Sequence, residues 1–172
     1  KKFINKKIQK GIICDIGCST GEFIESLNWN GEKYGMEVNE YAIRIAQNKN
    51  LSFSKNIFNQ KEYFDLVIFR GTIQHIDEPF RFIKETYNSL KKGGYICFLS
   101  TPNTNSLLYK IKNNLGMLDE KVNFFIPNDI GLKNALINYG FNEVEIEYPY
   151  LKTPYCNIID DHLMFIKNIF SK

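Results

Sequence analysis

Two acidic residues about 20 positions apart have the types and spacing that indicate a ligand-binding site. Asp15 ends a short apolar run and precedes a turn in which Gly17 and Gly21 allow the backbone to approach a ligand. Glu37 closes the next apolar run, where a carboxylate can accept hydrogen bonds from two ribose hydroxyls. We therefore predict a nucleoside site in which Asp15 binds an ammonium group or orders the loop, and Cys18 contributes its backbone rather than a reactive thiol.

The segments around these residues alternate between strand and helix patterns. Strands are expected at 11–16, 33–38, 51–55, 64–69 and 95–99, with helical patterns at 22–28, after Asn39 and after Asp77. This alternation predicts an α/β fold, a doubly wound and mostly parallel Rossmann-like sheet with helices on both faces. Ligands of such sheets bind beyond the carboxyl ends of the strands, where the strand order reverses, which places the site after residue 16.

Helix boundaries can also be read from local chemistry. Asn39 is expected to cap the helix that follows Glu37, because its side chain can accept from backbone amides. The helix that begins at Asp77-Glu78-Pro79 is expected to end at Lys91-Lys92-Gly93-Gly94. Basic residues there would complement the helix dipole, and glycine would permit a left-handed cap.

The carboxyl-terminal part of the chain has a looser pattern. We predict a helix at 128–139, a sixth strand at 141–150 and a helical tail within 151–172. The stretch 100–127, which carries Tyr109, Phe124 and Phe125, is a candidate lid and acceptor pocket, since connections this long are uncommon unless functional.

Four ordered motifs resemble those of class I, Rossmann-like S-adenosylmethionine-dependent methyltransferases. The run Ile13 to Gly21 resembles their D-x-G-x-G-x-G motif, and Tyr34 to Val38 resembles their second-strand motif. Phe64 to Phe69 resembles their F-D-x-V strand, and Leu90 to Gly94 resembles their L-K-P-G-G turn. Ser19 stands in place of the middle glycine and Lys92 in place of the usual proline.

The resemblance implies one methyltransferase domain over residues 1–172, S-adenosylmethionine as cofactor and S-adenosylhomocysteine as product. It implies these cofactor-binding residues: Asp15, Gly17, Cys18, Gly21, Glu37, Val38, Asn56, Ile57 and Arg70. The adenine edge is expected near Asn56-Ile57, and the methionine moiety near Asp15 and the Phe69-Arg70 turn, with Arg70 offering its backbone carbonyl rather than its charge.

His75, which follows the fourth expected strand, is the candidate catalytic residue. An imidazole titrates near neutrality and can act as a general base, although His75 can equally brace the helix that begins at Asp77. Residues 70–76 and Pro102-Asn103 resemble a subgroup that often modifies glycans, their precursors or quinone-type phenols. We therefore expect methyl transfer to a small-molecule acceptor, with oxygen favoured.

Two other functions compete with this interpretation. A nicotinamide-dependent oxidoreductase shares the fold and the acidic ribose contact, but it expects G-x-G-x-x-G, a spacing that residues 17–21 lack. A non-catalytic binding domain would retain the fold without a working acceptor pocket. Asp15 and Glu37 argue that the cofactor site is intact, but they do not establish an acceptor.

Composition limits the partners that we expect. The chain has 172 residues, 44% of them hydrophobic, and a formal net charge of +3 from 22 basic and 19 acidic residues. This charge balance argues against a nucleic-acid partner, and no apolar run approaches the roughly 18 residues that a bilayer span requires. The four cysteines form no C-x-x-C pair, and we expect a cytoplasmic protein with reduced thiols.

The two ends of the chain carry the remaining expectations. Asp160, Asp161 and His162 are too poor a ligand set for a metal, and we expect none. The chain begins with Lys1 rather than methionine, and the seventh strand usual in relatives is either absent or cut away, so we expect truncated ends. The exposed sheet edge that results, or the tail, would be covered within the molecule or by a second copy as a homo-oligomer.

Overall fold

The computed structural model describes residues 2–49, 51–53, 56, 58–112, 118 and 121–149. These residues form parts of two compact units, Lys1–Thr101 and Pro102–Lys172. The first unit contains every strand of the described chain, and the second contains two short helices. A single functional domain over residues 1–172 stays a prediction.

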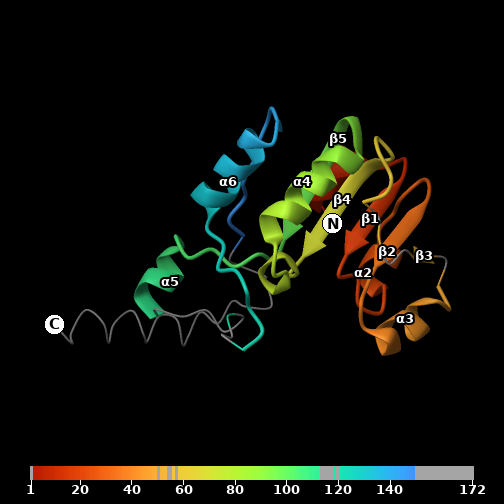
Figure 1. Cartoon of the computed structure of the whole chain (residues 1–172), viewed down its shortest axis with the longest axis horizontal. Coiled ribbons are helices and arrows are strands. Elements are labelled where there is room, and N and C mark those ends of the chain that lie inside the picture. The colour runs from red at the N-terminus through yellow and green to blue at the C-terminus, as the bar shows by residue number, and fades with distance from the viewer. Residues whose placement is uncertain are drawn as a thin grey trace. The chain divides into compact units, whose positions relative to one another are not determined.

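A parallel sheet of five strands forms the first unit (Figure 1). The strands are β1 (Ile13–Ile16), β2 (Lys33–Met36), β3 (Ser52–Phe53), β4 (Phe64–Arg70) and β5 (Leu90–Leu99). Their order is β3-β2-β1-β4-β5, so the chain reverses direction across the sheet at β1. This order confirms the predicted Rossmann-like α/β fold and puts the switch point at the end of β1.

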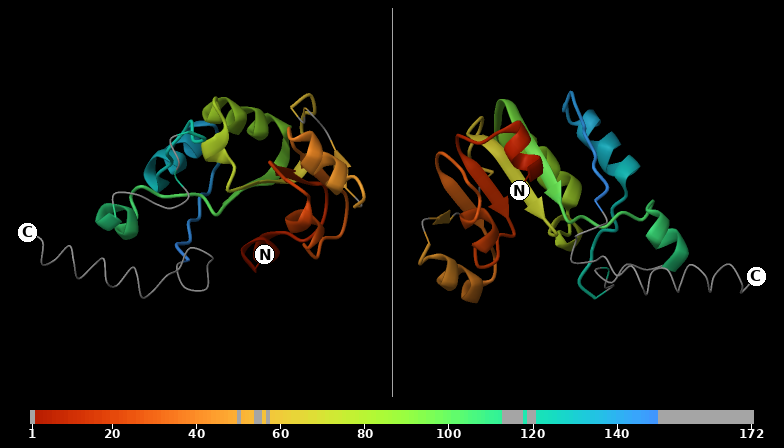
Figure 2. Two further views of the ribbon diagram at one scale, coloured as in Figure 1. Left: turned by 90° about the horizontal axis from the view of Figure 1, so that it is seen from below. Right: turned by 180° about the vertical axis from the view of Figure 1, so that it is seen from behind.

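Helices cover both faces of this sheet, and they are α1 (Lys2–Lys7), α2 (Glu22–Glu25), α3 (Glu40–Ala46), a 3-10 turn (Ile73–His75) and α4 (Pro79–Ser89). Figure 2 shows α1 and α4 on opposite faces of the sheet. Under α1 and α2 lies an apolar core of Ile4, Ile13, Ile24, Leu27, Leu66, Ile68 and Cys97. Burial of this kind stabilises the fold by about 25 cal/mol for each Å² of apolar surface removed from water.

The helix that follows β2 begins as the sequence predicts. The Asn39 side chain accepts hydrogen bonds from the amides of Tyr41 (3.0 Å) and Ala42 (3.1 Å), which are donors without partners inside the helix. Strand β2 ends at Met36, so Glu37 and Val38 lie just beyond it rather than within it. Asn39 and Glu37 therefore together set the path of the chain at the carboxyl end of β2.

The predicted end of helix α4 is wrong. The helix ends at Ser89, and 90–94 already belong to β5, where Leu90 pairs with Phe64 before an irregularity in the register. Lys91 does not complement the helix dipole, because its ammonium lies 2.7 Å from the Asp65 carboxylate. This ion pair holds residues 90–94 beside the beginning of β4. Pairing with β4 therefore determines the structure of this segment, although its basic residues and glycines are typical of a helix end.

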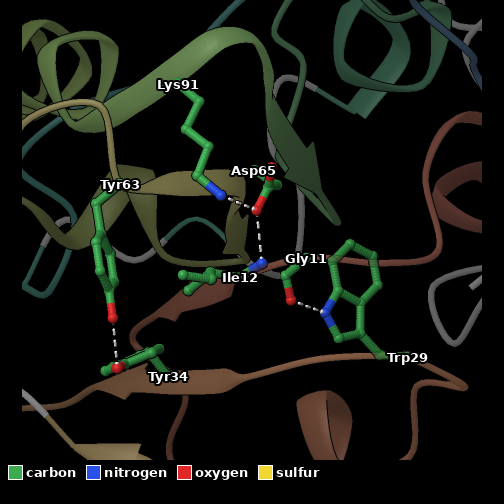
Figure 3. Close-up of polar contacts among 7 residues, drawn as sticks. All are labelled: Gly11, Ile12, Trp29, Tyr34, Tyr63, Asp65 and Lys91. Atoms are coloured by element: carbon green, nitrogen blue, oxygen red, sulfur yellow. Dashed lines mark hydrogen bonds and ion pairs between the residues drawn. The ribbon is translucent and has the colours of Figure 1, made fainter.

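Asp65 joins three segments at the amino end of the sheet (Figure 3). Its Oδ2 accepts from the Ile12 amide and from Lys91 Nζ, both at 2.7 Å, while its own amide donates to the Ile12 carbonyl at 2.8 Å. Burial alone would raise the pKa of Asp65, but these hydrogen bonds lower it below its usual value. Asp65 thus ties β1 to β4 and β5 at the edge opposite the predicted site.

We expect Asp65→Ala to lower the free energy of unfolding by about 2 kcal/mol, because it leaves the Ile12 amide and the Lys91 ammonium without their shared acceptor. Urea denaturation measures the change. Glu40→Ala removes an ion pair to Arg44 in which both side chains are at least 75% exposed, and it should leave the midpoint where it is. Equal midpoints for Asp65→Ala and the unsubstituted protein would contradict this account.

The second unit contains α5 (Leu107–Lys112) and α6 (Asp129–Asn138). The helix predicted at 128–139 is confirmed, with the Asn128 side chain accepting from the Gly131 amide at 2.8 Å. The sixth strand predicted at 141–150 is wrong for residues 141–149, which form no strand in the structure. An alternating pattern forms a strand only where a neighbouring strand pairs with it, and none of the described strands pairs with these residues.

Hydrogen bonds close the two ends of the stretch 103–127 on one another. The Thr104 amide donates to the Pro127 carbonyl at 3.2 Å, and Asn105 Nδ2 donates to Asp129 Oδ1 at 2.9 Å. Hydrogen bonds from Tyr148 and Asn105 lower the pKa of Asp129 to about 2, so this carboxylate stays ionised at neutral pH. The role of 100–127 as a lid stays a prediction, and the tail 151–172 lies outside the described residues.

Candidate functional site

The turn after β1 has the backbone that a close ligand requires. Gly17 and Gly21 adopt φ of +71° and +75°, a region that favours glycine. A Cβ on Gly17 would lie 2.5 Å from Thr72 Cγ2, and one on Gly21 would overlap the Leu51 side chain. Ser19, which replaces the middle glycine of the motif, also takes positive φ, at 51°. The turn is therefore kept in its conformation by packing on both sides.

Backbone hydrogen bonds attach this turn to the end of β2. The amides of Gly17 and Cys18 donate to the Met36 carbonyl at 2.8 and 3.2 Å. The Cys18 side chain is 5% exposed and fills the space beside Gly35. Burial, together with the charges of Asp15 and Glu37, raises the pKa of the Cys18 thiol to about 12, so it is not a reactive thiolate.

Glu37 connects the two loops through its carboxylate. Oε2 accepts from the Ser19 amide at 2.9 Å, and Oε1 accepts from the amides of Val38 at 2.7 Å and Asn39 at 2.9 Å. Each carboxylate oxygen has two acceptor positions, so Oε2 can accept from one more donor. Asp15 and Glu37 consequently lie at the same edge of the sheet, as a shared ligand requires.

Asp15 is a buried carboxyl group at the end of β1. It is 2% exposed, and its Oδ1 has no hydrogen-bond partner among the described residues. Burial raises the pKa of Asp15 to about 7, with Arg70 opposing this shift and Glu37 adding to it. A buried acceptor without a partner is costly, and a cationic donor such as a ligand ammonium group would satisfy it.

Val38, Asn56 and His75 follow strands β2, β3 and β4 in the chain. Val38 follows Glu37 with its side chain 86% exposed, and Asn56 is exposed with its Oδ1 accepting from the Phe58 amide at 3.0 Å. Ile57 lies outside the described residues. His75 is exposed at the end of the 3-10 turn, with its Nε2 3.4 Å from Gln74 Nε2.

Arg70 is the last residue of β4, and its side chain contacts Phe23 of helix α2. Its guanidinium carbon lies 4.8 Å from the centre of the Phe23 ring, a cation–π contact. Its carbonyl accepts from Thr72 Oγ1 at 3.1 Å. Neither Phe23 nor Thr72 was predicted at the site, and only strand register and helix position bring them there.

These groups fit S-adenosylmethionine. Asp15 offers a buried acceptor for an ammonium group, Glu37 an acceptor for a ribose hydroxyl, and the exposed Val38 side chain an apolar contact for a base. Among the described residues, no group of three or more His, Cys, Asp or Glu side chains could hold a metal ion. Asp160, Asp161 and His162 lie outside that part of the chain.

Comparison with known proteins points to one family. A family model described as a methyltransferase domain matches residues 1–146. A methyltransferase of Thermotoga maritima that depends on S-adenosylmethionine is 27% identical, with a TM-score of 0.67 over 83% of this chain and 69% of that one. One from Archaeoglobus fulgidus is 20% identical, with a TM-score of 0.68 over 99% of this chain and 82% of that one. The family predicted from the motifs is thereby confirmed.

A curated relative adds a different substrate to the comparison. The tRNA U34 carboxymethyltransferase of Campylobacter lari is 26% identical over 160 residues. The alignment covers 82% of this chain and 53% of that protein, so the chain spans about half the length of this relative.

No helix among the described residues has the length and apolar character needed to cross a bilayer.

Proposed function

The chain belongs to the methyltransferase domain family, and from this we propose that it transfers the methyl group of S-adenosylmethionine to a small-molecule acceptor, preferably to oxygen. One observation supports the site above all others. The Glu37 carboxylate bonds the Ser19 amide in the turn after β1, next to the buried Asp15 whose Oδ1 has no partner among the described residues. This geometry offers one ligand two acidic contacts, one in β1 and one just beyond the end of β2.

The residues of the chain would act mainly by binding and positioning. Asp15 would accept from the ammonium group of the methionine moiety, Glu37 from the ribose, and Val38 and Asn56 would flank the adenine. The glycines at 17 and 21 would let the backbone lie close to the ligand. When bound, the cofactor supplies an electrophilic methyl carbon, so alignment of the acceptor and exclusion of water account for most of the catalysis.

His75 would take the proton from an acceptor hydroxyl. It lies in the 3-10 turn that follows β4 in the chain, and its side chain is exposed. Histidine is the side chain that most often serves as a general base in enzymes.

A tRNA acceptor is the second candidate, and the relative from Campylobacter lari favours it. The charge balance of the chain favours a small acceptor instead, because 22 basic and 19 acidic residues do not make the strongly basic surface typical of nucleic-acid binding. Binding to RNA would also depend strongly on salt concentration. A comparison of methyl transfer to tRNA and to small-molecule acceptors at two ionic strengths therefore separates the two candidates.

Calorimetric titration tests the cofactor assignment first. We expect S-adenosylmethionine and S-adenosylhomocysteine to bind with micromolar dissociation constants, about −8 kcal/mol, and NAD not to bind. Transfer of a labelled methyl group to pools of phenols, sugars and unmodified tRNA then identifies the acceptor class. Tight binding of NAD without binding of either adenosyl ligand would overturn the proposal, and ligand binding without transfer to any pool would favour a non-catalytic domain.

A further inference from the structure

Arg70 and Asp15 lie on the same face of the sheet. Asp15 in β1 is in register with Ile68 in β4, and Arg70 follows Ile68 by two residues. Because side chains alternate between the faces of a strand, Arg70 points to the face that carries Ile68 and Asp15. Ile68 belongs to the core beneath α2, and α2 also carries Phe23. The two charged side chains are therefore neighbours at the carboxyl edge of the sheet.

Phe23 holds the Arg70 guanidinium in place without neutralising it. The ring lies 4.8 Å from the guanidinium carbon, and Phe23 itself packs against the core cluster. An arginine stacked on an aromatic ring retains its in-plane N–H donors, because the ring occupies only the face of the guanidinium. A guanidinium has five N–H donors, so Arg70 can contact Phe23 and still donate hydrogen bonds to a ligand.

The positive charge of Arg70 has no carboxylate bonded to it within the described part of the chain. By contrast, Arg44 forms an ion pair with Glu40 at 3.8 Å, and Arg81 forms one with Glu78 at 2.7 Å. The Arg70 charge acts instead on Asp15, whose pKa it lowers against the effect of burial. At the end of β1 and β4 the protein therefore presents a carboxyl group and a guanidinium side by side.

We propose that Arg70 binds the carboxylate of the methionine moiety of S-adenosylmethionine through its side chain. This inference rests on the proposed function and deepens it. An amino-acid tail carries an ammonium and a carboxylate on the same carbon, and Asp15 and Arg70 offer the complementary charges from neighbouring strands. It assigns to Arg70 a charged contact where the sequence predicts only a backbone carbonyl, and that carbonyl already accepts from Thr72 Oγ1.

The test uses a ligand that lacks only the group in question. Calorimetry compares S-adenosylmethionine with decarboxylated S-adenosylmethionine for the unsubstituted protein, Arg70→Met, Arg70→Lys and the surface control Arg44→Met. We expect Arg70→Met to bind S-adenosylmethionine at least about tenfold more weakly and to bind the decarboxylated ligand as before. Arg70→Lys should lie between, because it retains the charge without the planar fork, and Arg44→Met should change neither affinity.

The same titrations can overturn the inference without affecting the proposed function. If Arg70→Met weakens both ligands equally, or neither, Arg70 does not recognise the carboxylate. A normal affinity for both ligands with a raised KM for the acceptor would also overturn it and would place an acceptor anion at Arg70. If the unsubstituted protein binds neither ligand, the proposed function fails together with the inference. Circular dichroism of each variant verifies that it is folded.

Discussion

Asp15→Asn is expected to abolish binding of S-adenosylmethionine and, in the same variant, to stabilise the unliganded protein at pH 8. Asp15 is 2% exposed and its Oδ1 lacks a partner among the described residues, so the ionised form of Asp15 is costly when no ligand is bound. Burial raises the pKa of Asp15 from 3.8 to about 7, which corresponds to about 4 kcal/mol at most. An amide at this position carries no charge and avoids that cost.

The pH dependence of stability follows from the direction of this shift. Between about pH 4 and pH 7 the folded protein keeps a proton on Asp15 that the unfolded chain has lost, so stability falls as pH rises through this range. Below pH 4 both states are protonated and the cost disappears. Urea denaturation at pH 5 and pH 8 should therefore show a larger gain for Asp15→Asn at pH 8. An equal or smaller gain at pH 8 would contradict the buried-carboxyl account.

Ligand affinity should show the opposite dependence on pH. Only the ionised carboxylate attracts an ammonium group strongly, so we expect the affinity for S-adenosylhomocysteine to rise about tenfold from pH 6 to pH 8. In Asp15→Asn any residual binding should be nearly independent of pH over this interval. Titrations in buffers of different ionisation enthalpy would also report proton release on binding, and its absence near pH 6.5 would count against Asp15 as the ammonium contact.

Glu37→Ala is the second change with a large expected effect. The carboxylate accepts from the Ser19 amide and from the amides of Val38 and Asn39, and we propose that it also accepts from the ribose. Its removal should weaken the affinity for S-adenosylhomocysteine about a hundredfold, because charge-assisted hydrogen bonds to the ligand and to the loop are lost together. Glu37→Gln retains one acceptor oxygen and should have an intermediate affinity.

Glu40→Ala is the matched control for this variant. Glu40 lies three residues away on α3, is exposed and pairs only weakly with Arg44, so its loss should leave the affinity unchanged. Hydrogen exchange adds a structural readout, since the Ser19 amide should exchange faster in Glu37→Ala than in Glu40→Ala. Equal affinities in the two variants would remove Glu37 from the site.

Local patterns were sufficient to predict the elements that carry the site. The turn after β1 depends on glycines whose positive φ and close packing are properties of that turn, and Asn39 caps the next helix through amides two and three residues away. The position of Glu37 follows from the spacing of two consecutive strands. These features are encoded within about 25 residues of sequence, where pattern and structure correspond closely.

Features that depend on pairing between distant segments could not be predicted in the same way. Residues 141–149 alternate as a strand would, yet no described strand pairs with them. Lys91, which was expected at the end of a helix, instead pairs with Asp65, 26 residues earlier in the chain. The proximity of Arg70 to Asp15 requires the register between β1 and β4, which neither segment reveals alone. The same holds for Phe23, whose contact with Arg70 depends on how α2 lies on the sheet.

A crystal structure of the protein with S-adenosylhomocysteine bound tests the central claim most directly. The account predicts ribose hydroxyls within hydrogen-bond distance of Glu37 and the ligand amino group at the Asp15 carboxylate, with the nucleoside crossing the ends of β1 and β2. A ligand that binds away from this edge, or that contacts only one of the two carboxylates, would contradict it.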